Sequence, residues 1–215
     1  MHIHPSILSA DFVNLESELQ TISSADAVHV DVMDNHFVPN LTFGTQMVKR
    51  LQEVSPIPLD VHLMISNVDD FGPEYAKLGI ASTTFHIEAS KDPKSLIKAI
   101  RKAGSKVAVA IKPGTELSQV ENLFTEIDML LIMTVEPGFG GQPLIEATLE
   151  KVANAKASFK ARNLEISIQV DGGVTTENIS QLSLLGADTF VAGSSVFMSS
   201  DRAGNIARLR DLARL

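Results

Sequence analysis

The sequence of 215 residues contains no cysteine. This absence excludes disulfide bonds, zinc sites built from thiolates, and catalysis by a thiol nucleophile. Basic residues are also few: 18 Lys and Arg stand against 26 Asp and Glu, which gives a formal net charge of −8. A chain this acidic is not expected to bind nucleic acid or an anionic membrane through a basic surface.

Long hydrophobic runs are missing as well. No stretch approaches the roughly 20 apolar residues that a membrane span needs. The first residues, Met-His-Ile-His-Pro, lack the basic segment and apolar run of a secretory signal. We therefore expect a cytoplasmic protein. With 44% hydrophobic and 20% charged residues, the composition is that of a globular protein, and the length fits one domain.

Short apolar runs rich in Val and Ile alternate with amphipathic segments along the whole chain. The runs predict strands and the segments predict helices. Strict alternation predicts a parallel sheet with right-handed crossovers. Eight units in about 200 residues fit an α/β fold of the TIM (β/α)8 barrel type, as a single domain over residues 1–215. Strands are expected at residues 3–8, 27–33, 59–64, 82–86, 106–111, 129–133, 167–170 and 189–192.

The expected helices fill the intervals between these strands. A doubly wound open sheet is the alternative arrangement for the same pattern, but no Gly-x-Gly-x-x-Gly follows the first strand, which disfavours it. The clearest helical segments are residues 12–22, 45–54, 93–103, 117–124 and 145–161.

Histidine and aspartate residues interrupt three of the apolar strands near their C-terminal ends. His29 and Asp31 alternate with valines, so both side chains point to one face of their strand. His62 occupies a similar place in the third strand and Asp171 in the seventh. Barrels bring the C-terminal ends of their strands together in one site. We therefore expect a His/His/Asp/Asp cluster, which suits one Zn, Mn, Fe or Co ion.

Each of these residues also has a structural interpretation. A single histidine in a strand is more often a hydrogen-bonded core residue than a metal ligand. Asp171, which precedes two glycines, could merely cap a turn. The combination of four such residues on one face of a barrel favours the metal site.

Three glycine-containing loops follow the last three expected strands. Glycine lets the backbone approach a ligand closely and direct successive N–H groups at one anion, and the helices that follow favour negative charge at their N-termini. Barrels commonly bind phosphate at this position, so we expect a phosphate site, although one such loop alone would indicate only a tight turn. The residues are Gly138, Phe139, Gly140 and Gly141, then Gly172 and Gly173, then Gly193 and Ser194.

These motifs resemble those of the ribulose-phosphate 3-epimerase family. The similarity runs through nearly the whole chain and is most specific in residues 29–44, HVDVMDNHFVPNLTFG, and residues 137–142, PGFGGQ. One departure is Asn35, where the family usually has glycine. Asn is the next best residue for a left-handed backbone.

The resemblance implies a TIM barrel with one divalent metal ion, bound by His29, Asp31, His62 and Asp171. It implies an isomerase of the pentose phosphate pathway that interconverts D-ribulose 5-phosphate and D-xylulose 5-phosphate through an enediolate. Asp31 and Asp171 would be the acid/base pair, and Ser6 and His62 would contact the sugar phosphate together with Asp171 and the three glycine loops. Met33, Met64 and Met133 would line the reacting carbon, although core packing explains any one of them equally well.

Several properties remain open at this level. The substrate could be another ketose phosphate such as allulose 6-phosphate, and a non-catalytic sugar-phosphate or metal-binding protein is the alternative of a different class. The intact aspartate pair disfavours the latter. Family resemblance suggests a homo-oligomer, with dimer and hexamer both possible, and the identity of the metal depends on availability as well as affinity. His36 is expected in a surface or lid loop, and His86 is expected at most to support a ligand.

Overall fold

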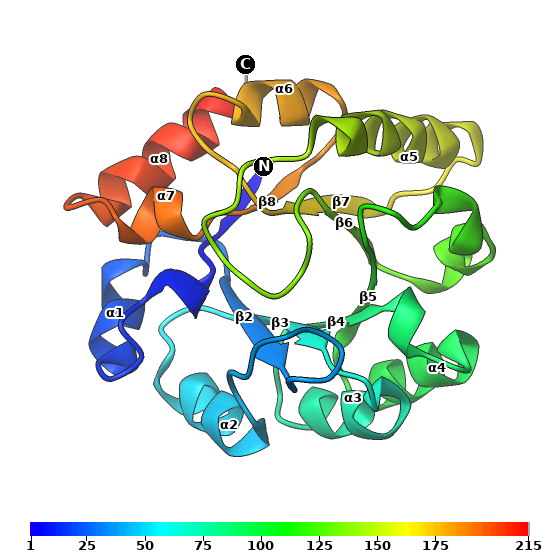
Figure 1. Cartoon of the computed structure of the whole chain (residues 1–215), viewed down its shortest axis with the longest axis horizontal. Helices are drawn as coiled ribbons and strands as arrows, with labels where there is room; N and C mark the ends of the chain where they lie inside the picture. The colour runs from blue at the N-terminus through cyan, green and yellow to red at the C-terminus, as the bar shows by residue number, and fades with distance from the viewer. Residues whose placement is uncertain (215) are drawn as a thin grey trace.

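Eight parallel strands form a ring at the centre of the molecule, and helices surround it (Figure 1). The computed structural model describes residues 1–214. The strands are β1 His2–His4, β2 Val28–Met33, β3 Leu59–Met64, β4 Ser82–His86, β5 Lys106–Ile111, β6 Met129–Met133, β7 Ser167–Asp171 and β8 Thr189–Val191.

The α-helices follow the strands in chain order and form the outer layer. Short 3₁₀ segments accompany them at several strand ends. The α-helices are α1 Leu15–Thr21, α2 Thr45–Val54, α3 Val68–Ala76, α4 Pro93–Lys102, α5 Leu149–Ala161, α6 Ile179–Leu184, α7 Ser194–Phe197 and α8 Arg202–Leu212. The 3₁₀ segments are η1 Ile7–Ser9, η2 Ile87–Ala89, η3 Leu117–Gln119, η4 Glu121–Glu126 and η5 Glu146–Thr148.

The sheet begins to close where β1, the first strand of the chain, pairs with β8, the last. Its order is β1-β8-β7-β6-β5-β4-β3-β2. The gap between β1 and β2 is bridged just beyond β1, where Ser6 pairs with His29 and the His29 N–H donates to the Pro5 carbonyl at 2.9 Å. The expected (β/α)8 barrel is therefore confirmed, and the open doubly wound sheet is not observed.

Both faces of the strands are buried, as expected for a parallel barrel. On the outer face, apolar side chains such as Val30, Val61 and Leu63 join one large core cluster with the surrounding helices. The alternate positions of the same strands point inward and include polar side chains. The register of β2 and β3 pairs His29 with Asp60 and Asp31 with His62, which brings the inward-facing polar residues together.

Some expected elements differ from the structure. The first strand is shorter than residues 3–8, because Ile7–Ser9 forms a 3₁₀ turn that the Ser6 hydroxyl caps by accepting from the Leu8 N–H. Residues 117–124 form 3₁₀ turns instead of an α-helix; Leu117, Val120 and Leu123 recur every three residues, which is the 3₁₀ period.

Two expected helices begin later than predicted. The α-helix expected from residue 145 starts at Leu149, after a 3₁₀ turn. The α-helix expected from residue 12 starts at Leu15. Phe12 lies before it and packs against Phe43, with ring centroids 4.9 Å apart. Within residues 1–214, no helix combines the length and apolar character that crossing a membrane would require.

The Asp34 carboxylate joins the loops that follow β2 and β3. Its Oδ1 accepts hydrogen bonds from the backbone N–H groups of His36 and Phe37, both at 2.9 Å. Its Oδ2 accepts from the N–H and the hydroxyl of Ser66, both at 2.7 Å. Burial would raise the pKa of Asp34, but these four hydrogen bonds lower it to about 2. Asp34 thus fixes two loops at the C-terminal end of the barrel.

We predict that Asp34→Asn lowers the free energy of unfolding by about 1–2 kcal/mol at pH 7, because an amide nitrogen cannot accept these bonds. A carboxyl whose folded-state pKa is depressed contributes its full stability above the unfolded pKa of about 3.9 and loses it as pH falls toward 2. The difference between parent and variant should therefore shrink below pH 4. Urea unfolding at pH 7 and pH 3 measures it. Asp70→Asn, at an exposed position of α3, is the control, and a difference independent of pH would contradict the prediction.

Candidate active site

Four expected residues meet at the C-terminal end of the barrel. His29 Nε2 and His62 Nδ1 lie 3.3 Å apart. Asp31 Oδ1 is 3.5 Å from the first nitrogen and 3.4 Å from the second, and Asp171 Oδ2 is 3.8 Å and 3.5 Å from them. The two histidines and Asp31 are almost completely buried. The structure therefore assembles the expected His/His/Asp/Asp cluster from β2, β3 and β7.

The spacing of these atoms fits a divalent metal ion. Four ligands held about 2.1 Å from one ion in a tetrahedron lie about 3.4 Å from one another. The five distances above run from 3.3 to 3.8 Å. Two imidazole nitrogens and two carboxylate oxygens are a donor set for Zn, Mn, Fe or Co. The cluster could hold such an ion with little rearrangement of its side chains.

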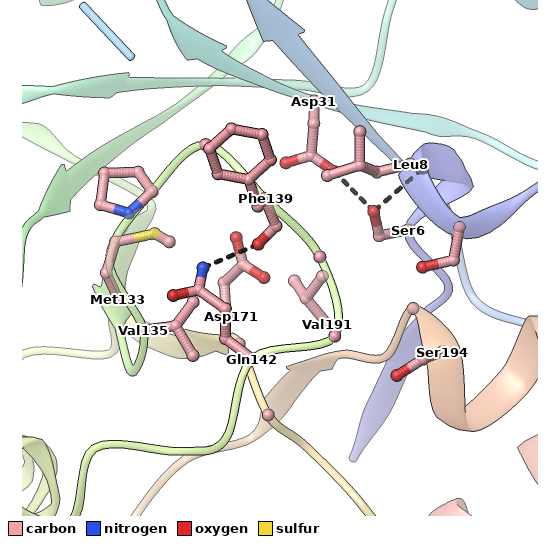
Figure 2. Close-up of a pocket in the computed structure, with 18 of the residues that line it drawn as sticks. Ser6, Leu8, Asp31, Met133, Val135, Phe139, Gln142, Asp171, Val191 and Ser194 are labelled. Carbon is pink, nitrogen blue, oxygen red and sulfur yellow. Dashed lines mark hydrogen bonds between the residues drawn. The ribbon is translucent and has the colours of Figure 1, made fainter. Parts of the chain in front are cut away.

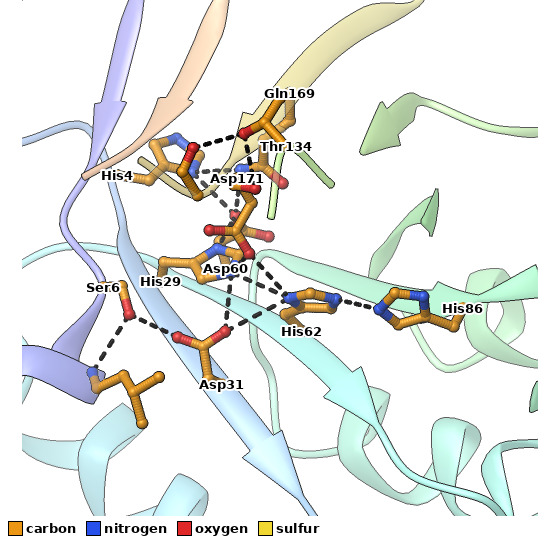
Figure 3. Close-up of polar contacts among 12 residues, drawn as sticks. His4, Ser6, His29, Asp31, Asp60, His62, His86, Thr134, Gln169 and Asp171 are labelled. Atoms are coloured by element: carbon orange, nitrogen blue, oxygen red, sulfur yellow. Dashed lines mark hydrogen bonds and ion pairs between the residues drawn. The ribbon is translucent and has the colours of Figure 1, made fainter. Parts of the chain in front are cut away.

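Asp60 contacts the ring of His29 on the side away from the cluster. It lies two residues before His62 on the same face of β3, and its Oδ2 is 3.0 Å from His29 Nδ1. The same oxygen is 2.9 Å from His4 Nδ1 and accepts from Gln169 Nε2 at 2.7 Å (Figure 3). Because Nδ1 of His29 is engaged with Asp60, Nε2 is the nitrogen left to face the cluster.

A second group of possible metal ligands consists of His4, His29 and Asp60. Both ring nitrogens lie 2.9–3.0 Å from the Asp60 oxygen. These are hydrogen-bond lengths, shorter than the separation of about 3.4 Å expected between ligands of one tetrahedral ion. We interpret this group as a hydrogen-bonded support for the first cluster.

The opposite charges of the histidines and aspartates shift the pKa values of the cluster. Burial alone would lower the pKa of His29, but the charges of Asp31 and Asp60 and their hydrogen bonds raise it well above its usual value. For Asp31, burial acts to raise the pKa, yet His29 and His62 lower it strongly. Without a metal ion, the carboxylates therefore favour a proton on the His29 imidazole. A divalent cation must displace that proton, so its binding weakens as pH falls.

Ser6 orients Asp31. The Ser6 hydroxyl donates to Asp31 Oδ2 at 2.5 Å and accepts from the Leu8 N–H at 3.2 Å. Asp31 thus has one oxygen directed to the histidines and the other held by Ser6. The Asp171 side chain is more open, with 14% of its surface exposed compared with 4% for Asp31. The two carboxylates therefore face the same site but differ in their exposure to solvent and in their hydrogen-bond partners.

A cavity of about 350 Å³ opens directly over the two aspartates (Figure 2). Met33, Met64 and Met133 contribute apolar lining beside them. The loop between β6 and η5 passes across the mouth of the barrel, and Gln142 Nε2 fixes it by donating to the carbonyls of Glu136 and Phe139, both at 2.8 Å. All the other residues expected to contact substrate except His62 also line this cavity: Ser6, Gly138, Phe139, Gly140, Gly141, Gly172, Gly173, Gly193 and Ser194.

Two residues expected to be peripheral have different surroundings. His36 is exposed in the loop after β2. His86, at the end of β4, is fully buried, and its Nε2 lies 2.9 Å from His62 Nε2. Burial, and to a smaller extent the charge of His62, lower the pKa of His86 to about 4, so it is neutral at pH 7.

The sequence interpretation missed Asp60, His4, Gln169 and Glu88 as parts of the site. A local signal existed for two of them. Asp60 precedes His62 by two residues in one strand, and alternation places both on the same face. Glu88 follows His86 by two residues and lies 3.1 Å from its Nδ1. The roles of His4 and Gln169 depend on contacts across the barrel.

Comparison with known proteins agrees with this geometry. Residues 2–197 match the Ribulose-phosphate 3 epimerase family. The chain is 46% identical over 208 residues to a ribulose-phosphate 3-epimerase of Mycobacterium leprae, covering 97% of this chain and 93% of the relative. It is 38% identical to one of Helicobacter pylori, covering 99% and 98%.

The fold also has solved counterparts. The crystal structure of 3-hexulose-6-phosphate synthase from Salmonella typhimurium superposes with a TM-score of 0.72 at 18% identity, covering 100% of this chain and 99% of that one. At this identity the likeness shows the shared barrel fold alone. The family match and the sequence relatives carry the assignment: the chain belongs to the ribulose-phosphate 3-epimerase family.

Proposed function

We propose that the protein interconverts D-ribulose 5-phosphate and D-xylulose 5-phosphate by moving one proton at the carbon beside the ketone. The observation that carries this proposal is the pair Asp31 and Asp171, which come from β2 and β7 and share one cavity and one histidine pair. Binding alone would not require two carboxylates at the base of the same cavity. Membership of the epimerase family supports the substrate.

The two carboxylates act as base and acid. Epimerisation removes a proton from one face of the carbon and returns one to the other face, so it needs a proton-transfer group on each side. Removing the proton leaves an enediolate, and a divalent ion held by His29, His62 and the two aspartates would supply the positive charge that stabilises it. Asp31, held by the Ser6 hydroxyl, is kept ionised and oriented.

The cavity walls protect this chemistry. The thioethers of Met33, Met64 and Met133 are polarisable and exclude water, and they have no proton to exchange with the intermediate. The glycine loops after β6, β7 and β8 would bind the phosphate through backbone N–H groups. This arrangement lets a chain of net charge −8 bind an anion without a basic patch.

The proposal includes a cytoplasmic enzyme that associates with copies of itself. Exposed apolar side chains support self-association, because large apolar surfaces left in water mark contact regions. They include Phe12, Val13, Leu41 and Met47, which belong to α2 or to the segments before α1 and α2.

Metal dependence is the first test. We expect exhaustive chelation to abolish turnover, and Zn, Mn, Fe or Co to restore it. His62→Ala should lose metal affinity strongly while the barrel stays folded, as circular dichroism and metal analysis will measure. Full activity in a sample shown to be free of metal would overturn the metal-dependent mechanism. Unchanged metal content in His62→Ala would leave His62 as a structural residue.

The aspartates are tested separately in heavy water. Asp31→Asn and Asp171→Asn should each reduce net epimerisation by about 10²-fold or more, because a positioned acid–base group contributes about 10²–10⁴-fold. With metal bound, each variant should exchange deuterium into one epimer only. Mass spectrometry of both sugars measures this, and metal analysis of each variant controls for loss of the ion. A metal-loaded variant that epimerises near the parent rate would show that two bases are not needed.

The phosphate site is tested with Gly140→Ala. An added Cβ would lie 3.5 Å from Ser9 Oγ, an ordinary contact, so the barrel should fold while access to the loop backbone is reduced. We expect a several-fold higher KM for the phosphorylated sugar and very poor turnover of the unphosphorylated one. Gly173 is less suitable, because its Cβ would lie 2.5 Å from the Leu144 backbone nitrogen.

The matched control for this test is Gly114→Ala, where a Cβ meets nothing within 4 Å. Its KM should equal that of the parent. If the phosphorylated and unphosphorylated sugars are turned over equally well, the glycine loops form turns and nothing more.

A further inference from the structure

A row of polar side chains leads from His62 away from the cluster. His62 Nε2 lies 2.9 Å from His86 Nε2 (Figure 3), and His86 Nδ1 lies 3.1 Å from Glu88 Oε2. The two imidazole rings lie edge to edge, with centroids 5.0 Å apart and planes 25° from parallel. Neither His86 nor Glu88 lines the substrate cavity, so their contacts act through His62.

The direction of these hydrogen bonds follows from their chemistry. An ionised carboxylate only accepts, so His86 must donate to Glu88 from Nδ1–H. A neutral imidazole then has a lone pair on Nε2, which accepts from His62 Nε2–H. In the neutral ring that a metal ligand requires, this leaves the lone pair of His62 on Nδ1, the atom that lies 3.4 Å from Asp31 Oδ1 and 3.5 Å from Asp171 Oδ2.

His29 has the opposite arrangement. Its Nδ1–H points to Asp60, so the neutral ring has its lone pair on Nε2, the atom facing the same two carboxylates. The two histidines of one cluster thus present different ring nitrogens. Each has a separate partner that determines which nitrogen is available, and His62 depends on His86 for this.

Glu88 is itself held firmly. Its Oε1 accepts from the Lys112 N–H at 2.8 Å and from the Thr115 hydroxyl. The loop that supplies these donors is fixed by Lys151 of α5, whose Nζ donates to the carbonyls of Lys112, Pro113 and Thr115 at 3.1, 2.9 and 2.6 Å. With one oxygen held by this loop, the other stays directed at His86.

The ring of His86 is also fixed on its other side. Phe37 packs against it with centroids 4.9 Å apart, and the Lys112 ammonium lies 3.8 Å above the Phe37 ring. Packing therefore prevents His86 from turning its nitrogens away from His62 and Glu88.

We infer that His86 and Glu88 are positioning residues that fix His62 as the Nε2–H tautomer, so that Nδ1 is the nitrogen it offers to a divalent metal ion. This inference rests on the proposed function, because the ion is part of that proposal. Partners of metal-bound histidines typically change metal affinity about 10–100-fold when they are removed.

The test uses His86→Phe, which keeps a ring of similar size but removes both nitrogens, and His86→Gln, whose amide oxygen can still accept from His62. The control is His36→Phe, the same chemical change at an exposed position outside the row. Zinc affinity is measured by competition with a chromophoric chelator. ¹⁵N NMR of the histidine rings identifies which nitrogen binds zinc, and thermal unfolding confirms that each variant is folded.

We expect zinc to bind His62 through Nδ1 and His29 through Nε2 in the parent protein. The zinc Kd should rise about 10–100-fold in His86→Phe, rise less in His86→Gln, and stay unchanged in His36→Phe. A parent-like Kd and parent-like ring spectrum in His86→Phe would overturn the inference. So would zinc bound to His62 through Nε2.

Failure of the proposed function has a different signature. A parent protein that binds no divalent metal would overturn the metal-dependent reaction. In that case the ring spectrum of the metal-free parent, taken at a pH high enough for the His62 ring to be neutral, decides the inference: an Nε2–H tautomer of His62 supports the role of His86 in fixing it, and an Nδ1–H tautomer contradicts it.

Discussion

The carboxylate of Asp60, completely buried inside the barrel, holds five of the eight strands in register at one point. From β3 it contacts His29 of β2 and His4 of β1, and it accepts hydrogen bonds from Gln169 of β7 and Ser82 of β4. An ionised group in such a place is costly unless it is fully paired. Here each oxygen has close partners, so burial raises the pKa of Asp60 less than the hydrogen bonds and charges of His29 and His4 lower it.

Barrel interiors are usually filled by layers of branched apolar side chains. In this protein, inward positions of β2, β3 and β7 carry His, Asp and Gln instead. The large apolar core lies between the strands and the helices, and a smaller apolar cluster contains Ala110, Leu131 and Met133 of β5 and β6. Such a polar interior is stable when every buried polar group has a hydrogen-bond partner, and removing one group destabilises it strongly because its partners are left unpaired. It supplies a rigid base on which His29, His62, Asp31 and Asp171 stand at ligand spacing.

The site combines this rigid base with loops that close its mouth. His29 is held by Asp60, and His62 is held through His86 by Glu88. Above them, the segments after β1, β6, β7 and β8 line the cavity, and Gln142 fixes the loop after β6 by hydrogen bonds to backbone carbonyls. The proposed chemistry needs both parts: fixed charges near the reacting carbon at the base, and backbone N–H groups at the rim that enclose a phosphate.

Much of this arrangement was predictable from local patterns. The apolar runs at 59–64, 82–86, 106–111 and 129–133 coincide with β3 to β6, because alternation and length are properties of each segment alone. The alternation within β2 also placed His29 and Asp31 on one face, and the barrel rule brought His62 and Asp171 to them.

Contacts between distant segments were not readable in this way. Gln169 reaches Asp60 across 109 residues of sequence, and no periodicity indicates which inward side chains meet at the centre of a closed ring. The same holds for His86, whose role depends on the ring of His62 lying 2.9 Å away on the neighbouring strand. The local sequence pattern therefore determined which residue types are available for the chemistry. Closure of the barrel and the register of its strands determined which nitrogen of each histidine and which oxygen of each aspartate points into the site.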